Sequence, residues 1–414
     1  MMIFRKIATL IATAGILLST MTGCAGAFST KTNAAEPPKA LSILLGNHLC
    51  SKELNISSPV LTDLVTKTIL DYGYISVISI DGNPSVISAE SYDIPAQYKN
   101  ATKTKLESDA EKKAKNMMLN VSSVKADDPE VDTLEAIRLA CRSLSTATEG
   151  AEKTMVIVDT GWSTTGLMNF ANNLLAGEPE AIAEMLAEKA ALPDLSGVTV
   201  YWLQLGDVAE PETELSPAQV KKLGDIWQAV IKKAGGNIIL SDSIPNNGAI
   251  GGSLPEVTTI SHEAEAPVVI NTSAEGELTA LSFETPLFFS EDQVQFLGDS
   301  DEYADESVAM KSIEPIAAYM KDNTDFNLLL VGTTAGDENT SYAKDLSYRR
   351  AEAVKGTLLD LGIDESRIIT RGLGSGDKWH IYGAGTTGAL AAQNRKVVLL
   401  DASSLDASEL LGED

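Results

Sequence analysis

One arginine stands out among the residues that could do chemistry. Leu346, Val354 and Leu358 recur at the spacing of a helix and predict an apolar stripe along it. Arg350 falls on the same stripe, one turn after Leu346 and one turn before Val354. A guanidinium is a planar fork that can bind a carboxylate through two parallel hydrogen bonds. Arg350 is therefore a candidate to bind an outside carboxylate, unless an internal acid such as Asp337 pairs with it.

Other reactive groups are scarce in this sequence. The three histidines, His48, His262 and His380, lie in different segments, and none falls in a recognisable pairing with a serine or a cysteine. The glycine-rich run at 372–376 lacks the lysine of a phosphate-binding loop. The many carboxylates are explained by an acidic surface and do not require a catalytic pair. We therefore expect no enzymatic activity and no cofactor.

Charge and cysteine content narrow the class of protein further. The 414 residues are enough for two ordinary domains, and the formal net charge is −26. This charge excludes nucleic acid as a partner, because phosphates require a basic surface. Beyond Cys24 only Cys50 and Cys141 remain, which is neither a disulfide framework nor a zinc spacing. They are expected to be buried thiols, although an exported protein could also join them.

The N-terminus has the pattern of an export signal. Arg5 and Lys6 precede an apolar run that ends in the residues MTGC. This pattern resembles a bacterial lipoprotein signal, in which residues 1–23 are removed and Cys24 receives a lipid. Residues 24–39 then form a flexible tether. The resemblance implies a protein of the cell envelope, anchored to a membrane on its periplasmic or extracytoplasmic face. The alternatives are an ordinary secretory signal and an uncleaved anchor.

Two regions must position the candidate residues. Residues 40–242 alternate buried apolar strands with helical patterns and predict an α/β fold, a doubly wound parallel sheet covered on both faces. Residues 243–264, rich in Gly, Pro, Asn and Ser, predict a linker. Residues 265–289 predict a hairpin or a strand extension. Residues 290–404 predict a small α+β domain of βαβαββ order with helices on one face, and residues 405–414 predict an acidic tail.

The first region resembles a von Willebrand factor type A domain in the segments LSILLGNHLC, DTLEAIRLACRSL, TMVIVDTGWS and GVTVYWLQLGD. Many members of that family hold a divalent cation through an Asp-x-Ser-x-Ser motif, a distant Thr and a further Asp. The matching positions here are Gly46, His48, Cys50, Thr133 and Asp159. Two oxygen ligands make a poor magnesium site, and a histidine with a cysteine falls short of a tetrahedral zinc set. The resemblance therefore implies a protein-binding or spacer module with a degenerate, metal-free site.

The second region contains the segments LLLVGTTAGD, LSYRRAEAVKGTLLDLGIDESRIITRGLG and NRKVVLL. With these segments it resembles the OmpA-like domain of the OmpA/MotB family, a periplasmic module that binds peptidoglycan. In that family an arginine at the position of Arg350 binds a carboxylate of stem-peptide diaminopimelate, and an aspartate in a Gly-His-Thr-Asp loop binds its ammonium. The resemblance implies a peptidoglycan site that includes Arg350, Thr334, Asn394 and Arg395.

The sequence departs from this pattern at the acid. Counting back from Arg350 without a gap, the loop becomes residues 332–335, and Ala335 stands where the family has its aspartate. Asp337 could replace that acid if the loop is re-routed, and Asp345 is a second candidate. The hypothesis is an envelope lipoprotein that tethers a membrane to the wall, with the first region recruiting a protein partner. The alternatives are a structural subunit of an envelope assembly without wall binding, and a metal-dependent adhesin.

Overall fold

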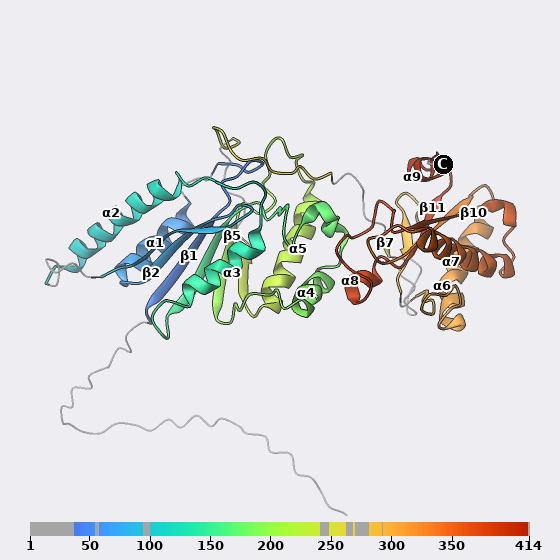
Figure 1. Cartoon of the computed structure of the whole chain (residues 1–414), viewed down its shortest axis with the longest axis horizontal. Coiled ribbons are helices and arrows are strands. Elements are labelled where there is room, and N and C mark those ends of the chain that lie inside the picture. Colours follow the sequence, from blue (N-terminus) through green and yellow to red (C-terminus); the bar gives the residue numbers. More distant parts are fainter. Residues whose placement is uncertain are drawn as a thin grey trace, which may run out of the picture. The chain divides into compact units, whose positions relative to one another are not determined.

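The computed structural model describes residues 37–53, 58–93, 100–240, 248–261, 268–269, 281–291 and 293–412. Two β-sheets organise these residues (Figure 1). The predicted signal peptide, Cys24 and most of the predicted tether lie outside the described residues. Among the residues that are described, no helix combines the length and the apolar character needed to cross a membrane.

The first sheet contains six strands in the order β3-β2-β1-β4-β5-β6. Five of them run parallel, and the edge strand β3 pairs antiparallel with β2. The prediction of a wholly parallel sheet is therefore wrong at β3. Only residues 80–84 join β2 to β3, and a connection this short forms a hairpin rather than a crossover. The strands are β1 (Lys39–Leu45), β2 (Tyr74–Ser79), β3 (Ser85–Ser91), β4 (Glu152–Val158), β5 (Val198–Leu203) and β6 (Asn237–Leu240).

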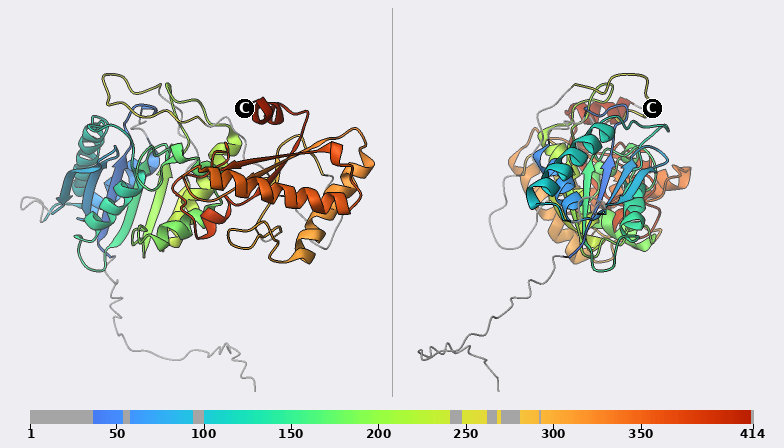
Figure 2. Two further views of the ribbon diagram at one scale, coloured as in Figure 1. Left: turned by 45° about the vertical axis from the view of Figure 1, so that its right-hand side comes forward. Right: turned by 90° about the vertical axis from the view of Figure 1, so that its left-hand side faces the viewer.

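Helices cover both faces of this sheet, as predicted (Figure 2). Helices α1 (Pro59–Leu70) and α2 (Lys103–Val121) pack on one face. The other face carries α3 (Thr133–Leu144), α4 (Pro179–Glu188) and α5 (Pro217–Lys233). Alternate side chains of β1 enter the two cores, because successive residues of a strand point to opposite faces.

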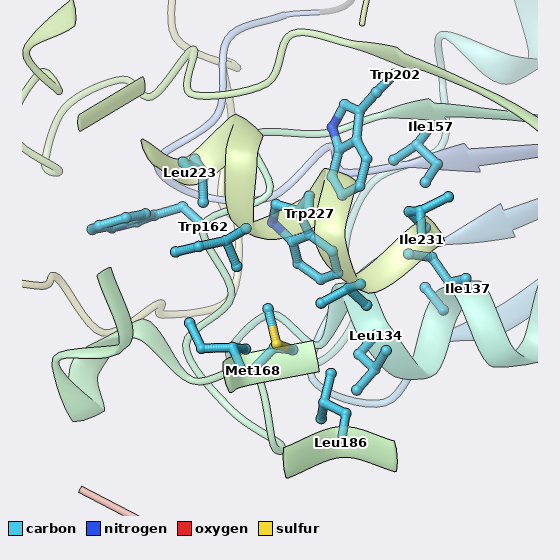
Figure 3. Packing of buried hydrophobic residues seen from close by; sticks show 14 of the residues in the cluster. Leu134, Ile137, Ile157, Trp162, Met168, Leu186, Trp202, Leu223, Trp227 and Ile231 are labelled. Atoms are coloured by element: carbon cyan, nitrogen blue, oxygen red, sulfur yellow. The ribbon is translucent and has the colours of Figure 1, made fainter. Parts of the chain in front are cut away.

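Two tryptophans in the larger core fix the loop that follows β4. The rings of Trp202 and Trp227 lie 4.9 Å apart, among side chains such as Ile157 (Figure 3). The indole Nε1 of Trp202 donates to the carbonyl of Asp159 at 2.9 Å, and that of Trp227 donates to the carbonyl of Gly161 at 2.9 Å. The packed core thus holds the backbone on both sides of residue 160.

The second sheet contains five strands in the order β10-β9-β11-β8-β7. Strand β11 lies antiparallel between β9 and β8, and β9 pairs parallel with β10. The sequence predicts a hairpin or a strand extension here. Strands β7 and β8 pair parallel, which a hairpin between them does not allow. Residues 270–280, which join them, lie outside the described part of the chain. The strands are β7 (Val268–Val269), β8 (Leu287–Phe289), β9 (Leu328–Thr333), β10 (Ile368–Gly374) and β11 (Val397–Asp401).

From β8 onward the strands and main helices follow a βαβαββ order. The first of these strands, β8, lies in the segment predicted as a hairpin or strand extension and not in the predicted domain at 290–404. A short helix, α8 (Ala389–Ala392), precedes the last strand. Helices α6 (Glu306–Asp322) and α7 (Ser341–Asp360) pack on one face. The other face is covered by Trp379 and by α9 (Leu405–Gly412), which buries Ala407 and Leu410. Most of the segment predicted as an acidic tail is therefore a packed helix, because its apolar residues recur at helical spacing.

The connection from β10 to β11 also contacts the first sheet domain. The backbone N–H of Tyr382 donates to the carbonyl of Asn172 at 3.0 Å, and the Asn173 side chain donates to the carbonyl of Lys378 at 3.0 Å. Ile381 and Leu390 join the larger core of the first domain. This connection is therefore shared between the two halves of the fold. The described part of the predicted linker packs similarly, since Ile260 is buried there.

Helix α7 lies directly on the backbone of the second sheet. A Cβ at Gly332 would meet the carbonyl oxygen of Ser347 at 1.9 Å, and one at Gly372 would meet that of Lys344 at 2.4 Å. The Ser347 hydroxyl accepts a hydrogen bond from the Gly374 N–H at 2.9 Å. These contacts fix the helix against β9 and β10, and thereby fix the position of Arg350 one turn further on.

We expect Gly332→Ala to destabilise the protein by about 3 kcal/mol or more, because the added methyl group overlaps backbone that cannot move freely. Gly356→Ala is the matched control on α7, where no heavy atom lies within 4 Å of a built Cβ. That change should stabilise by roughly 0.5–1 kcal/mol through helix propensity. Urea unfolding measures both, and similar values for the two variants would contradict the close packing.

Candidate binding site

A pocket of about 510 Å³ lies beside the end of β9 and helix α7. Its lining residues come from four stretches of chain, 291–299, 333–335, 386–388 and 395–396, and from Leu346 and Arg350 on α7. These stretches are far apart in the sequence and meet because β9, β11 and α7 pack together. The pocket contains Arg350, the candidate from the sequence analysis, and we call it the Arg350 pocket.

Arg350 is buried, with 7% of the residue exposed. Its Nε donates to the carbonyl of Ser300 at 2.9 Å, and one terminal nitrogen donates to that of Leu297 at 3.4 Å. Its Cζ lies 5.2 Å from the centre of the Phe296 ring. Within the described part of the chain, no carboxylate forms an ion pair with it. A guanidinium has five N–H donors, so donors remain for a ligand in the pocket.

Burial lowers the pKa of Arg350, and the nearby charge of Arg395 lowers it further, while the charges of Asp299 and Glu291 act in the opposite direction. An arginine stays protonated despite such shifts. The lowered pKa therefore indicates a positive charge that has lost much of its water. An anion that enters the pocket would restore that lost solvation.

The other charges of the pocket are largely satisfied within the protein. Glu291 binds Arg395 through both oxygens, at 3.1 and 3.0 Å, and Arg395 also donates to the carbonyl of Thr386 at 3.0 Å. The ammonium of Lys396 donates to the carbonyls of Trp379 and Gln393, at 3.2 and 3.1 Å. Burial lowers the pKa of Lys396, and the charge of Asp377 opposes this.

The structure places some of the site residues suggested by the sequence in the pocket and others outside it. Arg350, Thr334 and Arg395 line the pocket, and the Thr334 hydroxyl is buried without a hydrogen-bond partner among the described residues. Asn394 is buried and holds the backbone of residue 381 through two hydrogen bonds, of 2.9 and 2.8 Å, instead of lining the pocket. Asp337 is likewise not among the lining residues.

Neither of the acids considered as replacements for the missing aspartate reaches the pocket. Asp337 accepts a hydrogen bond from the N–H of Gly383 at 3.0 Å and lies 3.6 Å from the ring of His380. Asp345 pairs with Arg349 at 3.0 Å on an exposed part of α7. Ala335 does line the pocket, so its wall is apolar at that position.

The sequence analysis did not assign to the pocket the stretch that follows β8, which contributes Glu291, Phe296 and Asp299 to the lining. They follow β8 in a stretch without a regular hydrophobic period, where the only regular pairing described is the bridge between Phe296 and Tyr303. The residues VQFL in this stretch have the composition of a short strand, and nothing in that pattern indicates which neighbour they contact. Its run of acids beside a glycine, GDSDE, was the available signal for an exposed turn.

The first sheet domain contains a separate buried polar cluster at the carboxyl ends of β1 and β4. The ring Nε2 of His48 lies 3.0 Å from Asp159 Oδ1, and its Nδ1 lies 2.6 Å from the carbonyl of Leu49. Thr133 and the N–H of Gly161 donate to Asp159 Oδ2, at 2.9 and 2.8 Å. Both oxygens of this carboxylate are therefore occupied by protein groups.

This cluster does not fit a divalent cation. Asp159 is its single carboxylate, and His48 already occupies the oxygen that a metal would need. Gly46 explains how the chain approaches so closely, since a Cβ there would lie 1.9 Å from Asp159 Oδ1. Cys50 is buried with its pKa raised to about 11 by burial, and Cys50 and Cys141 are both free thiols. Among the described residues, no group of three or more His, Cys, Asp or Glu side chains could hold a metal.

The fold and the pocket define a class of protein: a small α+β domain that presents a partly desolvated arginine to a ligand. Residues 299–389 match the OmpA family, so the chain carries an OmpA-like domain in its C-terminal part. No curated protein matches the chain.

Solved structures that resemble this chain include three bacterial examples. One is the peptidoglycan-associated lipoprotein from Burkholderia pseudomallei, with 27% identity over 26% of this chain and 86% of that chain and a TM-score of 0.22. Another is the OmpA-like domain of FopA1 from Francisella tularensis, with 20% identity over 31% and 87% and a TM-score of 0.22. A third is the periplasmic domain of Helicobacter pylori MotB (residues 90–256), with 17% identity over 36% and 94% and a TM-score of 0.26.

We expect His48→Leu to destabilise the first domain by about 3–5 kcal/mol, because it leaves the Asp159 carboxylate buried without its histidine partner. The double variant His48→Leu, Asp159→Asn should lose less unfolding free energy than the two single variants together, since the asparagine amide leaves no unpaired charge in the core. Denaturant unfolding of the four proteins gives this coupling. Strict additivity would show that the two side chains do not stabilise each other.

Proposed function

We propose that the Arg350 pocket binds a carboxylate of the peptidoglycan stem peptide and so attaches this protein to the cell wall. One observation carries the proposal: a buried guanidinium with spare donors and no ion-pair partner among the described residues borders a pocket of about 510 Å³. Such a group gains more from a bidentate carboxylate than an exposed arginine does, because the pair is partly shielded from water.

The similar structures support this choice of ligand. One of them is named as a peptidoglycan-associated lipoprotein, and another is the periplasmic domain of MotB. Together with the match to the OmpA family, these names favour peptidoglycan as the source of the carboxylate, and the cell envelope as the place where this chain acts.

The N-terminal sequence adds the second half of the proposal. If Cys24 carries a lipid, the chain joins a membrane at one end and the wall at the other. Wall polymer held near the membrane presents many stem peptides at a high effective concentration, so even weak binding at the Arg350 pocket would hold the two together. The protein is then a tether of the cell envelope.

For the first sheet domain we propose a role in binding a protein partner, as a module related to von Willebrand factor type A domains. Its six-stranded sheet with helices on both faces is compatible with that resemblance. The pair of His48 and Asp159 argues against the alternative of a metal-dependent adhesin.

We propose a binding function and not a catalytic one for the Arg350 pocket. Its lining residues include no histidine and no cysteine, the commonest general bases and nucleophiles of enzymes. Its acids are Glu291, which is paired with Arg395, and Asp299. A reaction would need a second group positioned to move a proton, and the lining offers none that is arranged for this purpose.

Sedimentation with purified sacculi tests the tether. Arg350→Ala should lower the affinity for sacculi by roughly 10- to 100-fold, the loss expected for a charge-assisted pair of hydrogen bonds. Arg349→Ala is the matched control, because Arg349 is the neighbouring arginine but pairs with Asp301 and Asp345 and does not line the pocket. That variant should sediment like the unchanged protein.

The same assay decides between the tether and its main alternative. Sacculi with diaminopimelate stem peptides and sacculi with lysine stem peptides should be compared. If the unchanged protein sediments with neither, the chain does not bind the wall, and the structural subunit of an envelope assembly becomes the better description. Equal loss of binding in both arginine variants would show that general positive charge, and not the Arg350 pocket, is responsible.

A further inference from the structure

One acid that lines the Arg350 pocket forms no hydrogen bond or ion pair with the described part of the protein. Asp299 lines the pocket, is exposed, and has no hydrogen bond or ion pair from its carboxylate among the described residues. Glu291, the other lining acid, is bound through both oxygens to Arg395. Arg350 and Asp299 are thus one cation and one anion that share a pocket without neutralising each other in an ion pair.

The turn that carries Asp299 is fixed by Arg350 itself. The N–H of Ser300 donates to the carbonyl of Leu297 at 3.1 Å, which closes a four-residue turn with Asp299 at its third position. The two carbonyls that accept from the Arg350 guanidinium belong to the first and last residues of this same turn. The cationic group therefore positions the acid beside it through the backbone.

The backbone of Asp299 is in the left-handed region, with φ of 51°. Glycine occupies this region without strain, whereas an aspartate does so at a cost, although it tolerates it better than most residues. A turn with a positive φ at its third position usually has glycine or asparagine there, so this turn holds the aspartate at some cost. The charge of Asp299 also reaches the guanidinium, because it acts to raise the pKa of Arg350.

We propose that Asp299 determines the specificity of the Arg350 pocket by binding an ammonium group that the ligand carries next to its carboxylate. The ligand is then a zwitterionic end, such as the free amino-acid end of a diamino acid in a stem peptide. An acidic ligand without this ammonium would be repelled by Asp299, so the same side chain also disfavours the wrong partner. This inference rests on the proposed function. It places the acid on the turn before α6, while the position after β9 holds Ala335.

Two soluble peptides test the inference by calorimetry. One is L-Ala-γ-D-Glu-meso-diaminopimelate with its side-chain amine free, and the other is the same peptide with that amine acetylated. The unchanged protein should bind the free amine at least about tenfold more tightly. Asp299→Asn should remove most of this preference by weakening binding of the free-amine peptide only.

Asp301→Asn is the matched control, because it changes the net charge equally but replaces an acid that pairs with Arg349 and does not line the pocket. It should keep the preference. Asp299→Gly separates binding from folding, because it should relieve the backbone and raise the unfolding midpoint while it still loses the preference.

The outcomes separate the role of Asp299 from the wall-binding function of the Arg350 pocket. If the unchanged protein binds both peptides equally and only Arg350→Ala weakens binding, the role of Asp299 is refuted and the wall-binding function stands. If Asp299→Asn and Asp301→Asn lose affinity to the same extent, long-range charge explains the effect and the inference is overturned. If the unchanged protein binds neither peptide nor sacculi, both proposals fail together.

Discussion

The hydrogen bonds from Arg350 to the carbonyls of Leu297 and Ser300 are the constraint on which the pocket depends. They join helix α7 to a turn about fifty residues earlier in the chain. The guanidinium stays charged and partly desolvated, and it keeps N–H donors for a ligand. An internal aspartate would have held the same turn but would also have cancelled the charge. Carbonyl groups fix the side chain while they leave the positive charge available, which is the arrangement a receptor for anions requires.

This arrangement depends in turn on the close contact of α7 with its sheet. Gly332 and Gly372 let the helix backbone reach the strands, and Ser347 secures it to the N–H of Gly374. The motif around Arg350 is therefore mostly structural: its small residues and its serine set the height and rotation of the helix. Two described residues of this motif line the pocket, the apolar Leu346 and the charged Arg350.

The sequence could predict what is periodic and local. Most strands and helices of the two sheets, the inward position of Arg350 and the absence of an acid at Ala335 follow from short patterns. It could not predict the direction of β3, which depends on the length of one turn. Nor could it place Asp299, because that contact joins segments far apart in the chain. The acids of residues 405–414 predict a tail, whereas Leu405–Gly412 form a helix that buries Ala407 and Leu410.

Each of the two domains lacks a carboxylate that its family resemblance implies, and the surroundings of the missing group differ between them. In the second, the pocket wall is apolar at Ala335. In the first, the imidazole of His48 contacts one oxygen of the buried Asp159 carboxylate, and Thr133 and the N–H of Gly161 donate to the other. This described cluster is therefore held together by contacts within the protein, so we expect its stability to be unaffected by chelators of magnesium or calcium.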